Sequence, residues 1–197
     1  YSFYSILIFD QNDDMTATTL FDLIERLTSL MRIWNRQHPQ LAELQQKLHL
    51  LARRTLNQPT ALLQLVDSWI GEIASFLAAQ QLNDVLAIGE RFSSQLLAAL
   101  LNERGLRSQA LDARDFLRLD AAVVDWHLSA QLLEPLKKPG LNVVTGYIAR
   151  TIQGQSMTLG RNGSDYSATI LGRLLNAEAI HIWTDVDAIY SADPRKV

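Results

Sequence analysis

Residues 158–168 read Thr-Leu-Gly-Arg-Asn-Gly-Ser-Asp-Tyr-Ser-Ala and lead from an extended segment into a helix. The two glycines, three positions apart, let the backbone pass close to a ligand and adopt positive φ. Helix N-termini carry unpaired N–H groups and a positive dipole end, so anions bind there. Arg161 adds a planar guanidinium for a carboxylate or phosphate, and Asp165 could stabilise the helix or bind a substrate ammonium. On spacing alone, an ordinary connection with Ser164 as N-cap remains the alternative.

Two more segments of the chain predict strands. Residues 141–148 predict a strand that includes Val-Thr-Gly-Tyr-Ile, and residues 179–184 predict a second buried strand closed by Thr184 and Asp185. Open α/β sheets bind ligands beyond the carboxyl ends of their strands. We therefore treat Thr184 and Asp185 as candidate binding residues, although a solvated loop with an Asx-type turn would also explain them.

Hydrophobic periodicity supplies the rest of the expected fold. Apolar residues recur at spacings of three and four over 20–31, 41–52, 62–77 and 84–101, which predicts helices. The last of these is expected to be interrupted at Gly89 and to end at Gly105. Further segments predict strands at 5–9 and 108–111, a hairpin at 151–159, and helices at 126–136 and 164–175. Alternating strands and helices indicate an α/β fold, a parallel-rich sheet with helices on both faces.

Composition narrows the class of protein. The 197 residues are 48% apolar with a net charge of −3 and mixed charge signs, which favours one domain over 1–197 and gives no basic stripe for nucleic acid. The chain has no Cys, and its four His are scattered, so no metal site is predicted. No stretch reaches a transmembrane length by inspection, so we expect no membrane segment and a cytoplasmic location. Strand-like residues at position 1 and a turn signal at the end predict a piece truncated at both ends.

The three segments, in this order and spacing, resemble aspartate kinases of the amino-acid kinase superfamily. The resemblance is strong over roughly the last 60 residues and moderate over 89–116. It implies a three-layer αβα sandwich of amino-acid kinase type, with ATP, Mg²⁺ and L-aspartate as ligands. It also implies phosphorylation of L-aspartate to 4-phospho-L-aspartate in amino-acid biosynthesis. A homo-oligomer is expected on the same ground. Asn162 resembles the variant found in bifunctional enzymes that join aspartokinase to homoserine dehydrogenase, so such a domain is expected in the parent chain.

The resemblance also assigns roles to individual positions. Arg161 would hold a carboxylate of aspartate, while Asp165 and Glu90 would lie near its amino group. Ser164 would support them, and Tyr147 would pack on the substrate. Considered alone, Glu90 is most simply a solvated helical carboxylate. The residues that the resemblance assigns to the nucleotide are Thr184, Asp185, Tyr190 and Arg195.

The sequence also departs from these kinases. Their first strand carries a Lys-Phe-Gly-Gly segment whose lysine bridges the transferred phosphates, and residues 10–14 read Asp-Gln-Asn-Asp-Asp instead. Phosphoryl transfer depends on positioning and charge neutralisation, so we expect this chain by itself to be a poor catalyst. Two alternatives stay open at this point. One is another kinase of the superfamily, and the other is a non-catalytic regulatory or assembly segment that keeps the fold.

Overall fold

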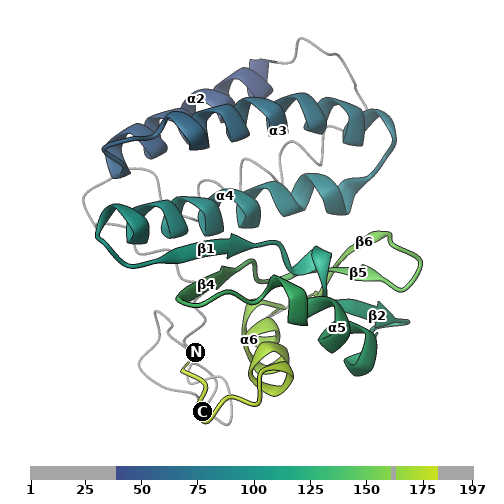
Figure 1. The fold of residues 1–197 in the computed structure, drawn as a ribbon. Helices are drawn as coiled ribbons and strands as arrows, with labels where there is room; N and C mark the ends of the chain where they lie inside the picture. The colour runs from purple at the N-terminus through teal and green to yellow at the C-terminus, as the bar shows by residue number, and fades with distance from the viewer. Residues whose placement is uncertain (1–38, 161–162, 182–197) are drawn as a thin grey trace, which may run out of the picture.

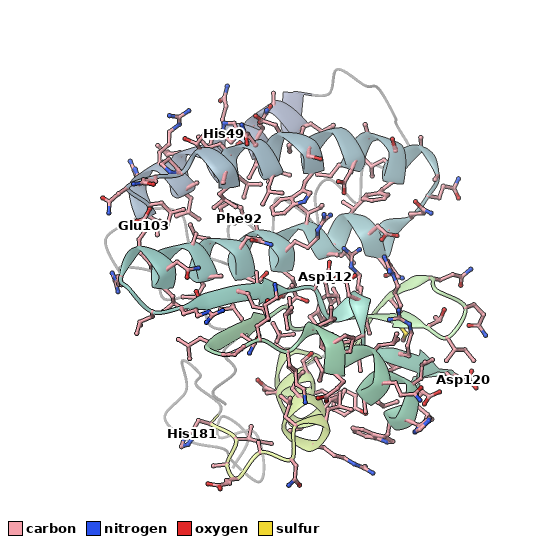
Figure 2. The ribbon with its side chains drawn as sticks, in the orientation of Figure 1. His49, Phe92, Glu103, Asp112, Asp120 and His181 are labelled. Atoms are coloured by element: carbon pink, nitrogen blue, oxygen red, sulfur yellow. The ribbon has the colours of Figure 1, made fainter. Side chains whose placement is uncertain are left out.

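The computed structural model describes residues 39–160 and 163–181. Three long helices form a layer on one side of the described part (Figure 1). They are α2 (Pro39–Thr55), α3 (Thr60–Ala78) and α4 (Leu82–Glu103). All three confirm helices expected from the spacing of apolar residues. Phe92 points from α4 into the core between these helices (Figure 2), together with buried residues that include Leu44, Leu48, Val66 and Ile73.

The course of α4 differs from the sequence prediction at Gly89. The helix runs through Gly89 without interruption, because the hydrogen-bonded turns on either side continue across it. Its end was predicted correctly. Gly105 has φ +79, its N–H donates to the Asn102 carbonyl at 3.0 Å, and the Leu106 N–H donates to the Leu101 carbonyl at 2.9 Å. This is the bonding pattern of a Schellman motif, for which glycine is suited.

The strands form two small sheets among the described residues. In the first, β1 (Ser108–Leu111) pairs in parallel with β4 (Leu141–Val144), and Ser108 lies opposite Leu141. The second has the order β3-β2-β5-β6, in which β2 and β5 are parallel and the outer pairs are antiparallel. Its strands are β2 (Arg118–Asp120), β3 (Val123–Val124), β5 (Ile148–Thr151) and β6 (Ser156–Thr158). The β5–β6 pair is the predicted hairpin.

The predicted single strand over 141–148 is wrong. The chain leaves the first sheet after Val144 and enters the second at Ile148, so the segment forms parts of two sheets. Tyr147 has φ +65 between them, a left-handed conformation that a continuous strand cannot contain. The apolar run shows burial on both sides of the break, but it carries no signal for the break itself.

Two more helices cover the other face of the strands (Figure 1). They are α5 (Trp126–Leu133), which continues into the short η3 (Glu134–Leu136), and α6 (Gly163–Leu174). A second core joins them to the sheets and to η2 (Ala113–Asp115); among its buried members are Phe116, Leu119, Leu133, Ala149 and Ile170. Helices on both faces of the strands confirm the predicted α/β sandwich.

Several predicted elements cannot be compared in full. The strand at 5–9 and the helix at 20–31 lie outside the described residues. Of the strand predicted at 179–184, residues 179–181 have no regular secondary structure, and the remainder lies outside the described residues.

Within the described ranges, α3 is long and apolar enough to cross a membrane by length and composition alone, which the sequence analysis did not anticipate. However, Asp67 accepts a hydrogen bond from Gln45 of α2 at 2.7 Å, and Glu72 pairs with Arg91 of α4 at 3.0 Å. Its apolar face is buried against α2 and α4. These contacts place α3 in the helical layer, with one apolar face covered by its neighbours.

Candidate active site

The site is built around the loop Thr145-Gly146-Tyr147 at the carboxyl end of β4. Thr145 is buried, its N–H donates to the Leu111 carbonyl at 3.0 Å, and its hydroxyl accepts the Ala113 N–H at 2.8 Å. Both bonds tie this loop to the chain that leaves the neighbouring parallel strand β1. The carboxyl ends of β1 and β4 therefore share one edge, which is where α/β sheets bind ligands.

Glu90 reaches this loop from α4. Its half-buried carboxylate accepts a hydrogen bond from the Gly146 N–H. Burial raises the pKa of Glu90 to about 7, and the Gly146 bond offsets only part of this effect. Burial disfavours the ionised form of a carboxyl group. A cationic partner stabilises that ionised form and so offsets the effect of burial. The position therefore suits the binding of an ammonium group.

Tyr147 packs against the first residue of α6. A Cβ atom on Gly163 would lie 2.7 Å from Cδ2 of Tyr147 and 3.1 Å from Cβ of Leu159, so glycine is required for this approach. The Tyr147 N–H also donates to the hydroxyl of Ser167 at 2.8 Å, one turn further along α6. These contacts place the N-terminal turn of α6 beside the loop that Glu90 holds from the other side.

The first turn of α6 presents Ser164 and Asp165 to solvent. The helix begins at Gly163, so the prediction of Ser164 as the N-cap is wrong and Ser164 lies within the first turn. The turn before it is set by Gly160, which has φ +74 and whose carbonyl accepts the Gly163 N–H at 3.0 Å. An exposed carboxylate at this end of a helix is stabilised by the dipole and remains available to a cationic ligand.

A family model described as the amino acid kinase family matches residues 33–197. The chain belongs to the amino acid kinase family. Bifunctional aspartokinase/homoserine dehydrogenase 2 of Escherichia coli is 49% identical to it over 120 residues, which are 58% of this chain and 15% of that protein. The match supports the predicted resemblance to aspartate kinases, the bifunctional form included.

Solved structures of this family agree with the fold. E. coli aspartokinase III in complex with lysine and aspartate superimposes with a TM-score of 0.74 at 27% identity, covering 88% of this chain and 42% of that one. The same enzyme in complex with aspartate and ADP gives 0.73 at 26% identity, covering 90% of this chain and 43% of that one. The predicted amino-acid kinase fold is confirmed. The chain spans less than half the length of these relatives.

Of the site residues expected from the sequence, Glu90, Tyr147, Ser164 and Asp165 lie within the described part of this family member. Glu90 bonds to Gly146, the neighbour of Tyr147 in the loop after β4, and Ser164 and Asp165 lie on the helical turn that packs against Tyr147. The other five expected residues lie outside the described residues: Arg161, Thr184, Asp185, Tyr190 and Arg195.

Sequence reasoning missed a polar cluster beside the loop. Arg114, only 5% exposed, pairs with Asp112 at 2.6 Å and with Asp84 of α4 at 2.9 Å. Asp112 lies between α4 and the strands (Figure 2), and its carboxylate is also 3.9 Å from Arg91. Burial opposes ionisation of Asp112, but the hydrogen bonds and charge of Arg114 outweigh it and hold the pKa of Asp112 below its usual value. The cluster fixes the start of α4 against the chain that follows β1.

Arg91 connects this cluster to the helical layer. Its guanidinium lies 4.8 Å from the ring centroid of Trp69 and pairs with Glu72, both on α3. The residue is next to Glu90, so the helix that carries Glu90 is anchored on both sides. The sequence offers Asp-Ala-Arg at 112–114 directly after a strand as a local signal, but the partner Asp84 is too distant in sequence for any spacing rule to identify.

Proposed function

We propose that this chain is part of a kinase that transfers the γ-phosphoryl group of ATP to the side-chain carboxylate of L-aspartate. The proposal is carried by one arrangement: Glu90 from α4 and the Asp165-bearing turn of α6 converge on Thr145-Gly146-Tyr147 at the carboxyl edge of the β1–β4 sheet. The similarity to aspartokinases supports the choice of aspartate.

The described residues act on the amino-acid end of the reaction. Glu90 and Asp165 bind the substrate ammonium, and the ionised form of Glu90 is favoured once that cation is present. Tyr147 packs on the substrate, and Arg161, which lies outside the described residues, holds a carboxylate of aspartate. The β-carboxylate is already ionised at neutral pH and can attack phosphorus without a general base, so the protein supplies position and charge.

ATP supplies the phosphoryl group and leaves as ADP, and we assign its binding to Thr184, Asp185, Tyr190 and Arg195. Within 39–160 and 163–181, no group of three or more His, Asp or Glu residues could hold a metal ion. Mg²⁺ in such sites is usually bound by substrate phosphates, water and one or two carboxylates, and it would neutralise phosphate charge. We further propose that the parent protein is a cytoplasmic homo-oligomer that includes a homoserine dehydrogenase domain.

Substrate selectivity tests the proposal. The full-length protein, incubated with MgATP and hydroxylamine, should form aspartyl hydroxamate from L-aspartate. Succinate, which lacks the ammonium, should react far more slowly, because Glu90 and Asp165 are then left without their cation. Arg161→Ala should lower kcat/KM for aspartate by about 100-fold, the expected loss for a charge-assisted bidentate contact.

The control for this experiment is Arg53→Ala, an exposed arginine of α2 far from the loop in sequence and structure, which should leave the kinetics unchanged. Equal turnover of succinate and aspartate would remove Glu90 and Asp165 from the amino-acid site. Absence of any aspartyl hydroxamate from the full-length protein would contradict the proposed reaction.

A further inference from the structure

Ser167 occupies the point where the loop after β4 meets α6. It is one turn into the helix, and only 3% of its surface is exposed. Its hydroxyl accepts the Tyr147 N–H at 2.8 Å and donates to the Gly163 carbonyl at 2.8 Å. A single hydroxyl therefore bonds to both segments that the proposed aspartate site needs.

The loop has a particular need for such an acceptor. Tyr147 is a non-glycine residue with φ +65, which costs conformational energy and persists only where surrounding contacts hold it. Its N–H faces α6, whereas the N–H of the preceding Gly146 is bonded to Glu90 of α4. Two consecutive amides are thus held by side chains from the helices on opposite faces of the strands.

The same hydroxyl also fixes the start of α6. By donating to the Gly163 carbonyl, it binds the residue against which the Tyr147 ring packs, where a Cβ atom would approach Cδ2 to 2.7 Å. Ser164 and Asp165 follow immediately. Any displacement of Tyr147 must therefore disturb either the hydroxyl bonds or the contact at Gly163.

We propose that Ser167 is a positioning residue for the amino-acid substrate: it locks the Tyr147 loop to the first turn of α6, so that Glu90, Tyr147 and Asp165 keep a fixed mutual geometry. The inference rests on the proposed function for its kinetic consequence, but its structural part does not. The hydroxyl acts through Tyr147 and Gly163 and does not need to touch the substrate.

The kinetic arm compares three variants in the full-length protein. Ser167→Ala removes the hydroxyl and should raise the KM for aspartate by about tenfold, the effect of one lost buried hydrogen bond. Its kcat and its KM for MgATP should change less than about twofold, because the bond positions amino-acid contacts that are the same in ground and transition states. Ser167→Thr keeps the hydroxyl and should retain a low KM for aspartate.

Thr169→Ala is the matched control. Thr169 is two residues further along α6, is exposed, and donates its hydroxyl to the Tyr166 carbonyl at 2.8 Å. This substitution removes the same kind of helical side chain to backbone bond without touching the loop, and its kinetic constants should equal those of the wild type. A rise in KM for Thr169→Ala equal to that for Ser167→Ala would overturn the assignment, as would an equal rise for Ser167→Thr.

Amide hydrogen exchange tests the lock without relying on activity. In the wild-type protein the Tyr147 amide should be protected. The Ile152 amide, which donates to the Leu119 carbonyl at 3.0 Å, is a hydrogen-bonded reference outside the loop, and its exchange should not change in Ser167→Ala. Ser167→Ala should accelerate exchange at Tyr147 by about tenfold or more. Accelerated exchange in a protein that does not phosphorylate aspartate would support the lock and reject the proposed function. A wild-type Tyr147 amide that exchanges as fast as an exposed amide would overturn the lock, whatever the kinetics.

Discussion

The helical layer and the loops at the sheet edge are stabilised by different interactions. Helices α2, α3 and α4 pack a continuous apolar core in which Leu44, Val66 and Ile73 are fully buried. The loops after β1 and β4 instead depend on single polar contacts, such as the Thr145 hydroxyl with the Ala113 N–H and Arg114 with two aspartates. Apolar packing is spread over many small contributions, whereas each polar contact satisfies a particular buried group.

This comparison predicts that changes in the helical core reduce stability and leave substrate binding unchanged. Changes at the loops should alter both, because the same bonds that stabilise them also position Glu90 and Tyr147.

The largest effect is expected for Arg114→Met. The substitution keeps most of the volume but leaves Asp84 without its cation and Asp112 with only Arg91, 3.9 Å away, which should lower the free energy of unfolding by on the order of 4 kcal/mol. Hydrogen exchange of the α4 amides in the full-length protein measures the loss. The control Arg53→Ala, at an exposed arginine, should change the free energy of unfolding by less than about 0.5 kcal/mol.

The pH dependence of the same variant sharpens the test. In the wild type, Arg114 holds the pKa of Asp112 low, so its stabilising contribution is present at neutral pH and is lost only as pH falls through that lowered pKa. In Arg114→Met the partly buried Asp112 carboxyl has lost its main cation, so its protonation relieves part of the cost. The difference in stability from the wild type should therefore shrink as pH falls from about 7 to about 5. If the stability difference between Arg114→Met and the wild type is constant over this pH range, lost packing and not lost charge accounts for it.

Next in size is Ile73→Ala in the helical core. Ile73 is fully buried on α3, and its truncation should destabilise the helical layer by on the order of 3 kcal/mol through lost burial and a cavity. The KM for aspartate should stay within about twofold of the wild type. Leu65→Ala on the same helix is the control. Leu65 is 38% exposed, so its truncation should reduce stability only slightly. A large rise in KM for Ile73→Ala would break the separation between the two regions.

Thr145→Val should have a smaller effect on stability and a measurable effect on binding. Valine has the shape of threonine but cannot accept the hydrogen bond from the buried Ala113 N–H. The loss of this bond should lower the free energy of unfolding by on the order of 2 kcal/mol. Because Thr145 precedes Gly146 and Tyr147, the aspartate KM should rise as well. Thr151→Val on β5 is the control: it removes a hydroxyl that accepts the Gln155 N–H at 3.2 Å in the hairpin, outside the loop, and should leave the KM unchanged. Unchanged binding in Thr145→Val would indicate that the loop geometry is set by other contacts.

The smallest expected effect is the titration of Glu90. Its pKa of about 7 in the free protein means that the neutral form predominates at lower pH and cannot pair with the substrate ammonium. The aspartate KM of the wild type should therefore rise several-fold between about pH 8 and about pH 6. Glu90→Gln should show a high KM with little pH dependence over this range.

Glu103→Gln, on the same helix, is the control for that titration. The Glu103 carboxylate accepts the N–H groups of Asn57 and Gln58, which lower its pKa, so it stays ionised between about pH 6 and pH 8. The pH profile of Glu103→Gln should match the wild type. A wild-type profile that is flat over this range would contradict a role for Glu90 as the titrating partner of the ammonium.

Linkage gives the corresponding direction for stability. Because the pKa of Glu90 is raised from 4.5 to about 7 on folding, the folded state binds more protons between these values. The wild type should therefore lose stability as pH rises from about 4.5 to about 7, and Glu90→Gln should remove this dependence.

The sequence by itself determined the long helices, the β1 strand, the β5–β6 hairpin and the family resemblance. Each follows from local information: periodic apolar residues, short apolar runs between turn residues, and a contiguous motif at 158–168. The role suggested for Asp165 came from that motif together with the resemblance, and the role suggested for Glu90 came from the resemblance alone.

Only the tertiary structure decided where the 141–148 segment breaks and which groups satisfy it. The left-handed loop at Tyr147 depends on distant partners: the Gly146 N–H bonds to Glu90 of α4, and the Tyr147 N–H bonds to Ser167, 20 residues further along the chain. The continuity of α4 through Gly89 was likewise settled by packing on α3 and the strands, which outweighs the weak helix propensity of glycine. Local propensity is a property of a few neighbouring residues, whereas a buried amide accepts whichever partner the assembled fold brings to it.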